Sequence, residues 1–139
     1  MTDTDRALYT TTVASRGGPD RVEADGDADH RLLISAPPAL ESTDRGAWNP
    51  EQLYAAAVAS CLHQALGVVA SEVGADLTGS EVHAAVTLEH SGALRYHFTT
   101  RVSVALPRVD AARRPTLIGQ ALRSCPMAAD IELDGTDRG

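Results

Sequence analysis

Hydrophobic and polar residues alternate most regularly in two neighbouring segments, residues 81–90 and 95–106. Alternation with a period of two is the pattern of a strand that has one packed face. In the second segment, that face would carry Tyr96, Phe98, Thr100, Val102, Val104 and Leu106. A short connection containing Gly92 separates the two segments, so we expect an antiparallel hairpin with one packed and one solvated side.

Nearer the amino terminus, two more segments have the composition of strands. Residues 7–15 are rich in β-branched and aromatic side chains and stop at a turn sequence of glycine and proline, residues 16–20. A second strand is expected at residues 30–36, after an acidic, glycine-containing stretch at 23–29. The polar segment that continues to Trp48 is expected to be an exposed loop.

A long apolar helix is predicted from residue 50 onward. Asn49 suits the cap, Pro50 the first helical position and Gln52 the capping box. Residues 53–70 carry no formal charge, but polar side chains such as His63 interrupt them and alanine outnumbers leucine. A buried central helix is therefore favoured over a membrane span. Its many small residues would let a second helix approach closely.

The last predicted helix is defined by an apolar stripe and two prolines. The stripe consists of Leu117, Ile118, Ala121, Leu122 and Cys125. The helix is expected to begin at Asp110 or, because of Pro115, about one turn later, and Pro126 ends it. Residues 135–139 are expected to form a frayed tail.

Composition is that of a small single-domain protein. The 139 residues suffice for one domain with a real core, taken as residues 1–139. With 12 basic and 19 acidic residues, the net charge is -7 and no basic stripe is present, which argues against a nucleic-acid partner. Residues 1–6 are polar and acidic, without the pattern of a signal peptide. We therefore expect a cytoplasmic protein whose cysteines are normally kept reduced.

Two cysteines are the main candidates for chemistry. Cys61 lies within the apolar helix, and Cys125 closes the last helical stripe just before Pro126. Taken alone, a cysteine in an apolar helix is ordinarily a small inert core residue. Zinc is a further alternative because His63 follows Cys61 closely, but side chains two apart on a helix diverge, so no metal site is expected. The histidines are expected to be solvated or simply hydrogen-bonded, and none is given a catalytic role.

Glu51 has a structural explanation, since a carboxylate in the first turn of a helix is stabilised by the helix dipole. A catalytic role beside Cys61 meets a geometric limit. Ten residues along one helix place the two side chains roughly 15 Å apart. Glu51 would have to act through an intermediary, or serve a cysteine on a second copy of the chain.

Three motifs together resemble the organic hydroperoxide resistance proteins, a branch of the osmotically inducible protein C (OsmC) superfamily. Residues 7–18, ALYTTTVASRGG, resemble that branch's first strand and glycine turn. Residues 49–53, NPEQL, followed by Cys61, resemble its signature helix, and Cys125 with Pro126 stands at the family's separation from Cys61. The resemblance implies an α+β fold and an intertwined homodimer, in which antiparallel sheets wrap around buried central helices and the active sites lie at the subunit interface.

The resemblance also implies a thiol-dependent peroxidase. Cys61 thiolate would attack an organic hydroperoxide, alkyl or fatty-acid, to give an alcohol and a sulfenic acid. Cys125 would then form a disulfide with Cys61. The resemblance further implies no bound cofactor and re-reduction by a dithiol such as a dihydrolipoyl group, carried on a lipoylated protein. An apolar setting around Cys61 favours organic substrates over hydrogen peroxide.

One position departs from the family pattern near the expected site. The family has an arginine just after the glycine pair, held by the glutamate that matches Glu51, and here that position is Pro19. Arg21 is taken as the activating cation, with Arg16 as the other candidate. Residues 127–130 also lack the family's polar and aromatic side chains. These departures leave an alternative open, a degenerate relative that binds or senses apolar ligands or peroxides.

Overall fold

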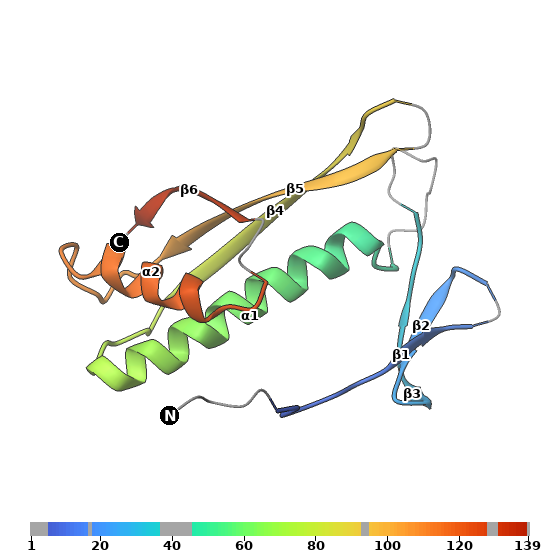
Figure 1. Ribbon diagram of the computed structural model, residues 1–139, viewed down its shortest axis with the longest axis horizontal. Coiled ribbons are helices and arrows are strands. Elements are labelled where there is room, and N and C mark those ends of the chain that lie inside the picture. The colour runs from blue at the N-terminus through green and yellow to red at the C-terminus, as the bar shows by residue number, and fades with distance from the viewer. Residues whose placement is uncertain (1–5, 17, 37–45, 93–94, 128–130, 139) are drawn as a thin grey trace. The chain divides into compact units, whose positions relative to one another are not determined.

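The computed structural model describes residues 6–16, 18–36, 46–92, 95–127 and 131–138. Expectations for the loop at 37–45 and for Gly17 therefore lie outside the described residues. The chain divides into two compact units, residues 1–50 and 51–139, and each is described by itself. Figure 1 follows the elements of both units along the chain.

The amino-terminal unit is a three-stranded antiparallel sheet of order β1-β2-β3. Its strands are β1 (Val13–Ser15), β2 (Arg21–Ala24) and β3 (Asp27–Leu33). β1 is much shorter than the predicted strand at 7–15, and β3 begins three residues before the predicted start at residue 30. Ile34, the residue after β3, forms an isolated parallel bridge with Trp48. Trp48, the last residue of the segment predicted as a loop, is therefore paired with the chain that leaves β3.

β2 was not predicted, because the sequence 23–29 appeared only as an acidic connection. Asp25 and Gly26 have positive φ angles of 53° and 72°, the backbone of a tight two-residue hairpin turn. The carboxylate Oδ1 of Asp25 accepts a hydrogen bond of 2.9 Å from Thr11 Oγ1. An Asp-Gly pair inside an acidic stretch is therefore a hairpin here, with strands on both sides.

The carboxyl-terminal unit contains the predicted hairpin. β4 (Glu81–His90) pairs antiparallel with β5 (Tyr96–Ala105), from Glu81 opposite Ala105 to His90 opposite Tyr96. A third strand, β6 (Ile131–Arg138), pairs parallel with β5. The expectation of a frayed tail is thus wrong for 135–138, because these residues bond to the free backbone edge of β5. The α+β class is confirmed, although this sheet is mixed rather than wholly antiparallel.

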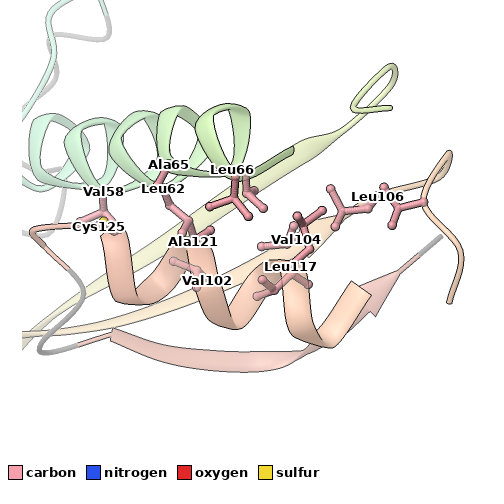
Figure 2. Packing of buried hydrophobic residues seen from close by; sticks show 13 residues of the cluster. Val58, Leu62, Ala65, Leu66, Val102, Val104, Leu106, Leu117, Ala121 and Cys125 are labelled. Carbon is pink, nitrogen blue, oxygen red and sulfur yellow. The ribbon is translucent and has the colours of Figure 1, made fainter. Parts of the chain in front are cut away.

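Two helices and β5 share one hydrophobic core (Figure 2). α1 (Pro50–Val73) begins at the predicted proline, and α2 (Arg114–Ser124) begins at the later of the two predicted positions, with Pro115 in its first turn. The core includes Val58, Leu62, Leu66 and Val69 of α1, Val102 and Val104 of β5, and Leu117, Ile118 and Ala121 of α2. The spacing of three and four residues in both helices explains why each contributes one stripe.

Only one side of α1 is buried within a single chain. Its other side is exposed and includes Ala57, Ser60, Gln64 and Val68, the last with 61% of its surface accessible. In the described part of the chain, α1 is the one helix long and apolar enough to cross a membrane, and 33% of its most apolar window is buried. A core helix of a soluble protein meets the same criterion, so this is weak evidence for a span.

Candidate functional site

The two cysteines meet where α1 passes the carboxyl-terminal end of α2. The sulfurs of Cys61 and Cys125 are 3.4 Å apart, and both residues are free thiols. Cys125 is 5% exposed, whereas Cys61 is only partly buried. The two cysteines that the resemblance pairs are thus in contact here as free thiols, and the disulfide between them stays a prediction.

Helix packing explains why these two thiols meet. Cys61 lies three residues after Val58 and four before Ala65, at the edge of the buried stripe of α1. Cys125 follows Ala121 by four residues and extends the buried stripe of α2 by one position. In Figure 2, Cys125 lies beside Val58 at this end of the core. A disulfide has an S–S length of about 2.05 Å, so a small closing movement of the sulfurs would form one.

The environment of Cys61 favours its protonated form. Burial raises the pKa of the Cys61 thiol above its ordinary value, and the adjacent Cys125 thiol raises it further. A backbone hydrogen bond from Met127 acts in the opposite direction and lowers this pKa. The thiolate therefore needs further stabilisation if it is to form readily at neutral pH.

Glu51 lies in the first turn of α1, as predicted, and is not beside Cys61. α1 is continuous over the ten intervening residues, so the expected separation of roughly 15 Å along the axis holds. The Oε1 atom of Glu51 is buried and has no hydrogen-bond partner among the described residues. A buried carboxylate oxygen without a partner is costly, so this atom marks a position suited to a donor or a cation.

Arg21, the predicted activating cation, is the first residue of β2 and is exposed in the amino-terminal unit. Arg16, the other candidate, is also exposed and follows β1. Pro19 lies in the turn between β1 and β2. The participation of either arginine in the site stays a prediction.

His63 and His83 have the hydrogen-bonded and exposed environments that the sequence led us to expect. His63 Nε2 lies 2.8 Å from Ser80 Oγ, which satisfies a polar side chain on an otherwise apolar helix. His83 pairs with Glu81 at 2.9 Å on the exposed side of β4. Among the described residues, no group of three or more histidine, cysteine or acidic side chains is arranged to hold a metal ion.

A hollow of about 420 Å³ lies near the start of α1, and the sequence did not indicate it. Its lining consists of Tyr54, Phe98, Thr99, Thr100 and Glu132. The rings of Tyr54 and Phe98 have their centroids 5.1 Å apart. Tyr54 precedes Cys61 by two helical turns, on nearly the same side of α1 and roughly 10 Å away along the axis. The spacing of seven residues between Tyr54 and Cys61 is the sequence feature that could have indicated this hollow.

Known proteins are similar in sequence to most of this chain. The sequence model of the family described as OsmC-like protein matches residues 42–134. An organic hydroperoxide resistance protein of Xanthomonas axonopodis pv. citri (strain 306) is 27% identical over 131 residues, which cover 91% of this chain and 89% of that protein. Peroxiredoxin OsmC of Escherichia coli (strain K12) is 33% identical over 92 residues, covering 62% of this chain and 64% of that protein.

The fold is similar to that of solved structures as well. The crystal structure of an organic hydroperoxide resistance protein OsmC from Legionella pneumophila has a TM-score of 0.82 at 24% identity, and the match covers 96% of this chain and 100% of that one. At this identity the likeness shows the fold alone, which is the α+β fold that the sequence predicts. With a family match over more than half of its length, the chain belongs to the OsmC-like protein family, in the organic hydroperoxide resistance branch.

Proposed function

We propose that the protein is a thiol-dependent peroxidase that reduces organic hydroperoxides to alcohols. The observation that carries the proposal is the 3.4 Å contact between a partly exposed thiol, Cys61, and a buried one, Cys125. A peroxide can reach the first sulfur, and the second is already placed to react with the product. The names of the relatives, an organic hydroperoxide resistance protein and a peroxiredoxin, support the same reaction class.

The reaction would run in three balanced steps. Cys61 thiolate attacks the terminal oxygen of ROOH, the O–O bond breaks, and RO⁻ takes a proton to leave as ROH while Cys61 becomes a sulfenic acid. Cys125 sulfur then attacks Cys61 sulfur, the S–O bond breaks, water leaves and a disulfide forms. An external dithiol, which we propose is a dihydrolipoyl group on a protein, reopens the disulfide by two exchanges and is itself oxidised.

Activation of Cys61 requires a cation, because burial and Cys125 both raise its pKa. We propose Arg21 for this role, held by the buried carboxylate oxygen of Glu51 that has no partner among the described residues. An arginine fork matches a carboxylate geometrically and keeps its charge when desolvated. Since Glu51 and Cys61 are far apart on one helix, this arrangement suits a site completed by a second chain.

A homodimer is therefore part of the proposal. None of the described residues in the amino-terminal unit is buried, although exposed apolar side chains there include Leu8, Tyr9, Leu32, Leu33 and Trp48. A small sheet without a core is not stable alone and needs another surface. The exposed, small-residue side of α1 offers close approach to a second helix. We propose that two chains intertwine through these surfaces, in the cytoplasm, where dithiol reductants keep the cysteines reduced.

Organic rather than hydrogen peroxide is proposed as substrate, because the surroundings of Cys61 are apolar. Val58, Leu62 and Ala65 flank it on α1, and the aromatic hollow at Tyr54 lies two turns away. Burying an alkyl or aryl group against apolar side chains lowers the free energy of binding. Hydrogen peroxide has a second hydroxyl in place of that group and gains no such stabilisation.

A second candidate function follows from Pro19, which stands where the family's activating arginine is expected. If neither Arg21 nor Arg16 replaces that charge, the raised pKa of Cys61 leaves little thiolate at neutral pH. The protein would then bind or sense apolar ligands or peroxides without rapid turnover.

Stopped-flow measurement of peroxide consumption separates the two functions. Reduced protein is mixed with cumene hydroperoxide or hydrogen peroxide, with Cys61→Ser as the matched control. The peroxidase is supported by a Cys61-dependent reaction that is faster than that of a free thiol and at least tenfold faster with the organic peroxide. A rate equal to that of free cysteine would favour the binding protein.

A further inference from the structure

A second hollow lies at the opposite end of α2 from Cys125, between the last turn of α1 and the start of α2. Its volume is about 230 Å³. Arg113 joins the two helices here, because its Nη2 atom donates a hydrogen bond of 3.2 Å to the backbone carbonyl of Val73, at the end of α1 (Figure 1). The lining consists of Val73, Ala112, Arg113, Thr116, Leu117 and Gln120.

Half of this lining consists of side chains that can donate hydrogen bonds. Arg113, Thr116 and Gln120 follow one another at spacings of three and four residues, so they share one side of α2. A guanidinium has several N–H donors, and the bond to Val73 uses one of them. The described residues provide no acceptor for the others, and no partner for the Thr116 hydroxyl or the Gln120 amide. These donors are therefore available to a ligand.

The rest of the lining is apolar. Leu117 belongs to the core and is 4% exposed, whereas Val73 is 46% exposed. No acidic side chain lines the hollow, although the chain has 19 acidic residues against 12 basic ones. A positively charged group with neighbouring donors thus adjoins an apolar surface. A ligand with negative charge at one end and an apolar remainder matches this combination.

We propose that this hollow binds a small monocarboxylate with a short aliphatic tail. The planar fork of Arg113 matches the two oxygens of a carboxylate, and Thr116 and Gln120 can donate to the same group. The tail would cover apolar surface at Val73 and Leu117. Pockets for drug-sized ligands measure roughly 300–1,000 Å³, so this volume suits a smaller molecule. The inference is independent of the proposed peroxidase, because neither cysteine lines the hollow.

NMR titration of the full chain with three probes tests the proposal. Sodium hexanoate has both the charge and the tail, whereas 1-hexanol lacks the charge and sodium phosphate lacks the tail. We expect hexanoate to give saturable shifts in the backbone amides of Val73, Thr116 and Leu117, with an affinity about tenfold or more above that of either other probe. Shifts that do not saturate, or equal affinity for 1-hexanol or phosphate, would overturn the proposal.

Two substitutions in the hollow locate the binding. Arg113→Gln should weaken hexanoate binding about tenfold or more, because it removes a charge-assisted hydrogen bond. Arg95→Gln, which removes the same charge at an exposed position before β5, should leave the affinity unchanged. Thr116→Val removes a hydroxyl but keeps the bond between Arg113 and α1, and should weaken binding about fivefold. Thr116→Val therefore decides the matter if Arg113→Gln disturbs the end of α1.

The variants also define the results that would contradict this site. Wild-type affinity for hexanoate in Thr116→Val and Arg113→Gln would mean that the probe binds elsewhere. An equal loss of affinity in Arg95→Gln would show attraction to the overall charge of the chain instead of to this hollow. No peroxide enters these measurements, so their outcome leaves the test of the peroxidase untouched.

Discussion

At the scale of residues, the two thiols differ in ways that assign them different roles. Cys61 is partly exposed at the edge of a helical stripe, whereas Cys125 is 5% exposed at the end of another. A peroxide that approaches from solvent therefore meets Cys61 first. The raised pKa of Cys61 is a cost of its apolar surroundings, and it makes the proposed reaction depend on a nearby cation.

Replacing Arg21 tests this dependence through the pH profile of the reaction. Because the thiolate attacks, the rate rises with pH only as pH passes through the pKa of Cys61, and a still higher pKa moves that rise to more alkaline pH. We expect Arg21→Gln to move the profile with cumene hydroperoxide to higher pH and to lower the rate at neutral pH about tenfold. Arg31→Gln, an exposed arginine on β3, is the matched control. Superimposable profiles for wild type and Arg21→Gln would exclude Arg21.

At the scale of elements, the site depends on where two helices stop and how they pack. α2 ends one residue before Cys125, and α1 runs unbroken past the point of contact. The core between them fixes the separation of the thiols. Changes that move the end of α2 should therefore affect the second step of the reaction more than the first.

Pro126→Ala is predicted to separate these two steps. Without proline, the clash with the preceding turn is lost and α2 can extend through Cys125, which would turn the thiol away from Cys61. We expect peroxide consumption in a single turnover to change little, while disulfide formation slows at least tenfold and the sulfenic acid becomes trappable by dimedone. Pro107→Ala, an exposed proline after β5, serves as the control. Disulfide formation at the wild-type rate would show that the turn does not need Pro126.

The packing of α1 determines which of its side chains contribute most to the free energy of unfolding. Leu66 is fully buried in the core cluster, so Leu66→Ala should lower the free energy of unfolding by about 2–5 kcal/mol. Gln64→Ala, on the exposed side of the same helix, removes a side chain of similar length without creating a cavity and should change it by about 0.5 kcal/mol or less. Urea unfolding of the two variants compares them directly, and a Leu66→Ala protein as stable as wild type would place the core elsewhere.

At the scale of the whole molecule, a single chain leaves large apolar side chains exposed in both of its units. The amino-terminal sheet has no buried residue among those described, and Val68 is 61% exposed on α1. In the homodimer that we propose, a second copy would cover both surfaces and supply a Glu51 from another helix to Cys61. The proposed assembly and the proposed site are thus linked.

A charge on the exposed side of α1 should break the assembly. We predict that Val68→Asp elutes and sediments as a single chain, whereas wild type has twice that mass, because an unpaired carboxylate is costly in an apolar interface. Thr87→Asp, on the solvated side of β4, should leave the mass unchanged. A Val68→Asp protein with the wild-type mass would remove this face of α1 from the interface.

Much of the fold follows from local sequence patterns, and the remainder depends on contacts that patterns do not specify. The start of α1 at Pro50, the β4–β5 hairpin and the end of α2 before Pro126 were predictable from capping, alternation and proline chemistry. β2 was missed because its acidic composition hid the Asp-Gly turn, and β6 because strand pairing at a sheet edge is a tertiary contact. Similarly, the resemblance predicted the pair of thiols, but the buried, unpartnered oxygen of Glu51 depends on tertiary packing, which side-chain identities do not reveal.

Mass spectrometry of the oxidised protein identifies which sulfurs are joined after reaction with a peroxide. Reduced protein is treated with one equivalent of cumene hydroperoxide, digested under non-reducing conditions and analysed for linked peptides. We predict a peptide pair joined through Cys61 and Cys125 within one chain, replaced in Cys125→Ser by a dimedone-trapped sulfenic acid at Cys61. Oxidation confined to Cys125, or the absence of a Cys61–Cys125 link after both thiols have reacted, would contradict it.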